Sequence, residues 1–177
     1  MTQLHYTGTA KTLHWTAAVL IVCGFSLGLF MTRLEISPDK LRLYALHKWI
    51  GITVFLITVA RVAWRATHPA PPPLPSMPDW QKRASRAAHW FLLALMVIIP
   101  ISGWIYSSAT GVSVVYLGVI PLPDLVGKDR ESAKALLILH KTLNYTLAAV
   151  VTVHVAAALK HHFVDHDGVM ARMLPGR

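Results

Sequence analysis

The sequence predicts an all-α membrane protein, in which a single domain over residues 1–177 folds as a bundle of four transmembrane helices. Of its residues, 54% are hydrophobic and 14% are charged, and the mean hydropathy is +0.48. This composition does not suit a soluble domain of the same length. Four apolar segments, each long enough to cross a bilayer core roughly 30 Å thick, alternate with polar or proline-rich stretches. They predict four spans in a lipid bilayer.

The net charge of +9 fits an anionic partner of some kind. No basic stretch is interleaved with polar residues that would read bases, so we expect no nucleic acid partner. Anionic lipid headgroups or an anionic reactant are better partners for this charge.

The first two helices are predicted over residues 11–33 and 41–66. The first apolar run resembles a secretory signal, but it is long for one and shows no clear small-residue cleavage site. It is also followed at once by Arg33 and Glu35. We therefore expect it to remain as a transmembrane helix.

The other two helices are predicted over residues 81–107 and 132–164. Prolines in residues 68–78 exclude a helix there and predict an extended connector within the domain. Pro100 predicts a kink in the third helix. Residues 108–131 are apolar in part, but prolines break this stretch, so we expect an interfacial loop rather than a span.

An even number of spans places both termini on one side of the membrane. Nine Lys and Arg residues fall on that side and eight on the other, which weakly favours cytoplasmic termini. A basic outer face is unusual; attraction of an anion explains it, and so does the solubility of the loops. Four of its cations stand where they would line a funnel for an anion: Arg33, Arg42, Lys48 and Lys141.

The fourth predicted helix carries histidines whose spacing would suit two cofactors at different depths in the membrane. His140 and His154 are 14 residues apart, so they share one helix face and lie ~21 Å apart along the axis. That separation is too long for one metal ion but suits two stacked haems, each taking one axial imidazole. Satisfied bundle histidines are the alternative, but intramembrane imidazoles are usually functional. His161 extends the same stripe toward the inner face.

Histidines on the other helices supply partners at each depth. At the outer level His47 pairs with His140, as two axial ligands of a low-spin haem. At the inner level His154 can pair with either His14 or His89, and sequence spacing does not choose between them.

Other residues stand near the predicted haem levels. Gly51 lies one turn after His47, where a haem close to the backbone would favour glycine; helix packing is an equal explanation for glycines in a membrane. Arg61 lies 14 residues after His47, at the inner level. It would pair with a haem propionate or extend to the interface.

Several short motifs follow one another along the four predicted spans: LHW at 13–15, HKWIG at 47–51, AHWFLLALMVIIPISG at 88–103, HKTLN at 140–144, HVAAALKHHF at 154–163 and the final MLPGR. Single motifs such as His-Trp carry little information, but the ordered set is specific and covers nearly the whole chain. In this order they resemble the bacterial cytochrome b561 family, a small four-helix di-haem family of the inner membrane that includes superoxide oxidase.

The resemblance implies a bundle that encloses two b-type haems, each with bis-histidine iron. It implies that His14 and His154 ligate the inner haem iron, and that His47 and His140 ligate the outer one. The family also has a histidine at the position of His89, where it is not an axial ligand.

For the superoxide oxidase members, the resemblance implies oxidation of superoxide at the outer face and reduction of ubiquinone near the inner face. It places the quinone site in the region of His161 and His162, with Trp15 and Trp80 as candidates for stacking. Imidazoles are suitable proton donors for quinone reduction, so His161 and His162 are the candidate catalytic residues. A basic outer face would raise the on-rate of superoxide.

Two other functions are compatible with the sequence. The first is an electron-transfer subunit that serves a partner dehydrogenase or a soluble redox protein, since a basic outer face also suits an acidic protein. The second is a haem-free bundle, such as a transporter or assembly factor, which would be colourless when purified.

Overall fold

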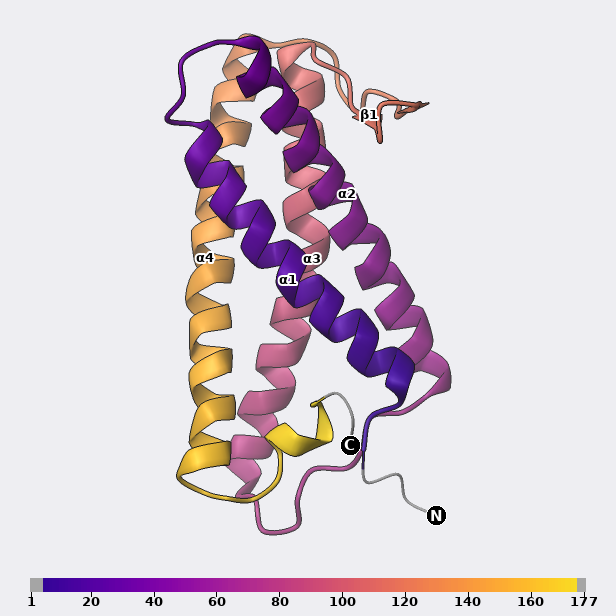
Figure 1. Ribbon diagram of the computed structural model, residues 1–177, viewed down its shortest axis with the longest axis vertical. Coiled ribbons are helices and arrows are strands. Elements are labelled where there is room, and N and C mark those ends of the chain that lie inside the picture. Colours follow the sequence, from indigo (N-terminus) through magenta and orange to yellow (C-terminus); the bar gives the residue numbers. More distant parts are fainter. Residues whose placement is uncertain (1–4, 175–177) are drawn as a thin grey trace.

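The computed structural model describes residues 5–174, and its main feature is a bundle of four long helices (Figure 1). Within these residues the four helices are long and apolar enough to cross a membrane, so the predicted fold class is confirmed. The helices are α1 (Gly8–Met31), α2 (Pro38–Thr67), α3 (Asp79–Thr110) and α4 (Arg130–Phe163).

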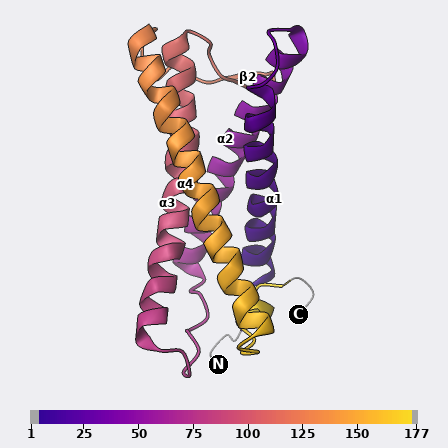
Figure 2. The ribbon, with the colours of Figure 1, turned by 90° about the vertical axis from the view of Figure 1, so that its left-hand side faces the viewer.

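The helices associate as two pairs, α1 with α2 and α3 with α4, and α2 also packs against α3. The helices α3 and α4 pack against each other; Figure 2 shows them crossing in the upper half of the view and diverging below. We call the end that carries the described parts of both termini the terminal end (Figure 1, bottom). The opposite end, where α1 turns into α2, is the hairpin end.

Each helix begins two or three residues before the predicted position. Polar caps explain three of these differences. Thr7, Ser37 and Asp129 each accept a hydrogen bond from a backbone N–H in the first turn of α1, α2 and α4. Because the apolar runs start later than the caps, hydrophobicity alone places the helix starts too late.

The segment between α3 and α4 contains a small β-hairpin that was predicted only as a loop. Strands β1 (Val115–Tyr116) and β2 (Ile120–Pro121) pair antiparallel. The indole N–H of Trp49 in α2 donates to Val115 O at 2.7 Å, and that of Trp104 in α3 donates to Pro123 O at 3.0 Å. These two indoles fasten the hairpin across the ends of α2 and α3.

The tail after α4 folds back under the bundle through the 3₁₀ turn η1 (Met170–Arg172). The indole N–H of Trp15 in α1 donates to Met173 O at 2.9 Å. Arg172 donates to Pro72 O at 2.7 Å, in the proline-rich connector. The tail therefore ties α4 to α1 and to the connector. The last three residues of the MLPGR stretch, with the predicted inner charge of Arg177, lie outside the described residues.

Few side chains of the described residues are buried. One buried cluster contains Ala17, Val54 and Met96, and the other contains Leu95, Ile99 and Leu147. Large apolar side chains on the outer helix surfaces, such as Val19, Ile138 and Val153, are exposed. Apolar surfaces on helices of this length suit a lipid environment.

Gly24 allows α1 and α2 to approach closely, since a Cβ at this position would lie 3.0 Å from Ile50 Cγ2. We expect Gly24→Val to force the two helices apart and to destabilise the bundle by about 1–3 kcal/mol. The control is Gly8→Ala, because a Cβ at Gly8 meets nothing within 4 Å. Thermal unfolding in detergent, followed by circular dichroism, measures both; equal Tm values for Gly24→Val and wild type would contradict this packing.

Candidate functional site

Two histidines face each other in the half of the bundle nearer the hairpin end. His47 of α2 and His140 of α4 have ring centroids 6.3 Å apart and planes at 86°. Two metal–imidazole bonds of about 2 Å, together with two ring radii of about 1 Å, span about 6 Å. The pair that the sequence predicts therefore stands at the separation that a shared metal requires.

The His47 ring is oriented by the backbone of α1. Its Nδ1 lies 3.1 Å from Gly24 O. Because a carbonyl oxygen can only accept, Nδ1 is the donor, and in the neutral ring the lone pair is on Nε2. This hydrogen bond is the arrangement usual behind a metal-ligating imidazole.

The His140 ring is oriented in the same way by Ser102 of α3, which sequence reasoning missed. The Ser102 hydroxyl donates to Ile99 O at 2.7 Å, so its oxygen is left to accept from His140 Nδ1 at 2.9 Å. The lone pair of His140 is then also on Nε2. The sequence holds no spacing signal for this contact, because the serine is on another helix.

Glycines make room for both rings. A Cβ at Gly28 would lie 3.2 Å from His47 Cε1, and one at Gly103 would lie 2.9 Å from His140 Cε1. Real Cβ atoms essentially never make the second contact, so residue 103 must be glycine for His140 to lie as it does. The rings are thus fixed by packing as well as by hydrogen bonds.

A cavity of about 500 Å³, which includes its open mouth, lies beside the pair. Gly51 lines this cavity. A Cβ at this position would have no other atom within 4 Å, so a side chain there would project into free space. Its other lining residues are mostly apolar and include Leu20, Val54, Met96 and Leu147.

Nearer the terminal end, His154 of α4 lies beside two other histidines. Its ring centroid is 6.3 Å from that of His14 and 5.4 Å from that of His89, with interplanar angles of 65° and 78°. The structure therefore brings all three together, as the sequence allowed. The His14–His154 separation equals that of His47 and His140.

Arg61 joins this group from α2. Its Nη2 lies 3.3 Å from His14 Nδ1. A guanidinium can only donate, so His14 Nδ1 is the acceptor here. This is the reverse of the arrangement at His47 and His140, and it places a fixed positive charge next to the terminal-end histidines.

The two histidines predicted to be catalytic have different surroundings. The His161 side chain is 17% exposed, and its Nδ1 donates to Asp167 at 2.6 Å. Burial raises the pKa of the Asp167 carboxyl, but hydrogen bonds from Val169 N–H and His161 outweigh it, so the pKa lies below its ordinary value. His162 is exposed and packs edge-on against Phe163, with centroids 4.7 Å apart.

The two predicted stacking residues also differ. Trp15 lies edge-on to His14, with ring centroids 5.4 Å apart. Trp80, in the first turn of α3, is 66% exposed. Of the two, the structure brings only Trp15 against one of the predicted haem ligands.

Sequence comparison gives the family. A family model described as prokaryotic cytochrome b561 matches residues 5–176, which is nearly the whole chain. The chain belongs to the prokaryotic cytochrome b561 family. The resemblance found in the sequence motifs is therefore confirmed.

Three relatives of this cytochrome b561 span most of its length. Cytochrome b561 homolog 2 of Escherichia coli is 34% identical over 174 residues, covering 98% of this chain and 93% of its own. A probable superoxide oxidase, CybB, of Yersinia pestis is 25% identical over 168 residues and 92% of each chain. Cytochrome b561 homolog 1 of Escherichia coli is 26% identical over 141 residues and 80% of each chain.

Membership makes the chain a membrane electron-transfer protein and implies b-type haem. The hairpin-end pair fits such a group, because His47 and His140 present unprotonated Nε2 atoms beside an apolar cavity. Four spanning helices in a prokaryotic cytochrome b561 point to the bacterial inner membrane.

The hairpin end of this cytochrome b561 carries acidic as well as basic side chains. Lys48 and Lys141 directly follow His47 and His140 in the chain. Arg42, however, forms an exposed ion pair with Asp39 at 3.4 Å. Five acidic residues accompany the eight cations of this end: Glu35, Asp39, Asp124, Asp129 and Glu131.

Proposed function

We propose that this cytochrome b561 binds two b-type haems and carries electrons between the two faces of the membrane. His47 and His140 hold the iron near the hairpin end, and His14 and His154 hold the iron near the terminal end. The observation that carries the proposal is the equal 6.3 Å separation of the two pairs. Haem iron supplies one-electron chemistry when bound.

His14 is the better second ligand of the terminal-end iron. The His89–His154 separation of 5.4 Å is shorter than the span of about 6 Å that two ligating imidazoles need. Ligation through Nε2 would require His14 Nδ1 to become a donor, so Arg61 would leave it. A haem propionate is the natural new partner for that guanidinium. At the hairpin end, Gly51 leaves space for the other haem.

We further propose that superoxide is the electron donor, at the hairpin end, and ubiquinone the acceptor, near the terminal end. Support comes from the name of the Yersinia pestis relative, which aligns over 92% of both chains. Two superoxide ions each lose one electron and become O₂, and one quinone takes two electrons and two protons. Lys48 and Lys141 attract the anion, and His161, held by Asp167, delivers protons. The termini then lie in the cytoplasm, where protons are taken up.

An electron-transfer cytochrome that serves a dehydrogenase or a soluble redox protein is the second candidate. The relative with 34% identity is named only as a cytochrome b561 homolog, and the mixed charges of the hairpin end suit a protein surface as well as a small anion. Reaction with superoxide in the absence of any other protein distinguishes the two functions.

We expect His14→Leu to lose about half of the haem per polypeptide, since it removes one iron ligand of one pair. His89→Leu should keep the full haem content. A pyridine haemochrome assay on purified protein measures both. Full haem in His14→Leu with loss in His89→Leu would assign the ligand to His89 instead.

We expect Ser102→Ala to release the hairpin-end haem about 10–100-fold faster, because loss of an outer-shell partner weakens metal binding by about that factor. Ser102→Thr keeps the hydroxyl and should restore retention. Ser108→Ala is the control, since Ser108 is also buried in α3 but donates to Trp104 O. Haem transfer to apomyoglobin measures the rates, and equal rates for Ser102→Ala and Ser108→Ala would contradict the role.

Rapid mixing of the oxidised protein with superoxide, with quinone absent, tests the reaction itself. We expect the haem bands to be reduced at a rate near the diffusional range, falling as salt is raised. Haem bands that stay oxidised would refute superoxide oxidation and favour a protein donor.

Quinone is then added to test the other half of the reaction. His161→Phe with His162→Phe should preserve haem content and reduction by superoxide, and abolish quinone reduction. Unchanged quinone turnover in this double variant would remove the histidines from the mechanism.

A further inference from the structure

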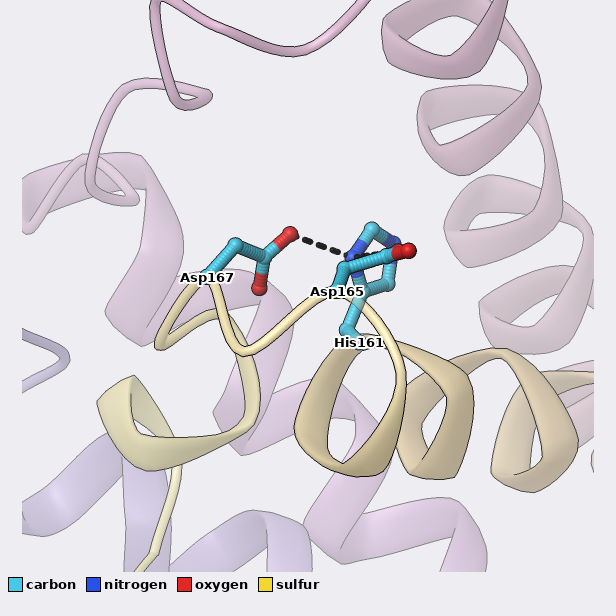
Figure 3. A group of neighbouring side chains, drawn as sticks. All are labelled: His161, Asp165 and Asp167. Atoms are coloured by element: carbon cyan, nitrogen blue, oxygen red, sulfur yellow. Dashed lines mark hydrogen bonds and ion pairs between the residues drawn. The ribbon is translucent and has the colours of Figure 1, made fainter.

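Three metal-binding side chains converge at the terminal end, outside the haem sites. His161 is in the last turn of α4, and Asp165 and Asp167 are in the loop that follows (Figure 3). One donor atom of each lies within 4.8 Å of the others. His161 Nδ1 is 2.6 Å from Asp167 Oδ2 and 3.3 Å from Asp165 Oδ2.

The backbone turns sharply to make this arrangement. α4 ends at Phe163, and both His166 (φ 50°) and Gly168 (φ 77°) then adopt left-handed conformations. These turns bring the chain back over the end of the helix. Asp165 and Asp167 consequently both face His161, whereas a continued helix would turn side chains two positions apart to nearly opposite sides.

Contacts outside the group hold the loop in this shape. Val169 N–H donates to Asp167 Oδ1 at 3.0 Å, which leaves Oδ2 directed at His161. Farther along, Arg172 donates to Pro72 O at 2.7 Å and Trp15 donates to Met173 O at 2.9 Å. The carboxylates are therefore positioned by an anchored tail and do not need an ion to bring them together.

We propose that His161, Asp165 and Asp167 form a binding site for a divalent first-row transition-metal ion, with Zn²⁺ as the best fit. Ligands at about 2.0–2.2 Å from an ion stand about 3–4 Å from one another, and the Nδ1–Asp165 distance already lies in that range. Asp167 would need to withdraw by about 1 Å or less. An imidazole in the set favours Zn²⁺ over Mg²⁺ or Ca²⁺.

The charges of the site also suit an ion. Two carboxylates and a neutral imidazole balance the charge of one divalent cation. At present the cation against Asp165 is Lys160, whose Nζ lies 2.6 and 2.8 Å from its two oxygens. The Lys160 side chain is 53% exposed and long enough to turn away. Lys160 therefore competes with a metal ion and keeps its affinity low.

Equilibrium dialysis of the tag-free, haem-loaded protein against Zn²⁺ tests the site. We expect one ion per chain, with affinity at least tenfold lower in His161→Gln and in Asp167→Asn. Lys160→Met should bind several-fold more tightly, a gain that misfolding cannot produce. Lys82→Met removes a comparable lysine paired with Asp79, and it should bind as wild type does, as should His162→Asn.

Two results would overturn the proposal. One is the absence of saturable binding up to about 1 mM Zn²⁺ in both wild type and Lys160→Met. The other is binding that survives His161→Gln but is lost in His162→Asn or His166→Asn, since the ion would then be held by exposed surface imidazoles. The haem absorption spectrum, unchanged across the variants, checks that each is folded.

This experiment measures bound Zn²⁺, so its result tests the metal site without depending on the proposed quinone chemistry. If His161 does deliver protons to a quinone, an ion on its Nδ1 would occupy the group that carries them. Quinone reduction would then be sensitive to Zn²⁺, while reduction of the haem by superoxide would not.

Discussion

Two pairs of imidazoles meet across the helices of the bundle, and the packing around them depends on where the rings lie. α4 supplies one member of each pair, and α2 and α1 supply the others, both at 6.3 Å. At the hairpin end, other residues also restrict the positions of the rings. Gly28 and Gly103 give the rings room, and Gly24 O and Ser102 Oγ fix their tautomers. A substitution at any one of these positions would move a ring, because each of them limits where that ring can lie.

The positions of the histidines in the bundle were predictable because helical geometry is regular. A separation of 14 residues on α4 fixes both the face and the depth of His140 and His154. At the outer level one partner was available, so the pair with His47 followed. At the inner level His14 and His89 both lie at the right depth, and the structure indeed places both against His154. Depth alone cannot distinguish side chains that reach the same point from different helices.

The features that the sequence did not predict depend on contacts between distant segments. Ser102 and His140 are 38 residues apart, and nothing local marks the serine as a partner. The hairpin has strands of two residues each, too short for an alternating pattern, and indoles from α2 and α3 hold it. The fold of the tail depends on Trp15 and the connector. The periodicity of the sequence predicts the helices and which residues share a helix face. The β-hairpin at one end and the folded tail at the other depend on long-range hydrogen bonds, which periodicity does not reveal.

The two ends of the bundle differ in the charge that lies beside their histidines. At the hairpin end, neutral groups hold both imidazoles through Nδ1. At the terminal end, the Arg61 guanidinium lies 3.3 Å from His14, in a region where water is largely excluded and charge is weakly screened. Nearby positive charge stabilises the reduced form of an iron centre and so raises its potential. In the proposed ligation Arg61 would pair with a propionate instead of His14, and that pairing would offset part of its charge. What remains of the Arg61 charge would favour the reduced state at the terminal end, where His161 and the folded tail lie.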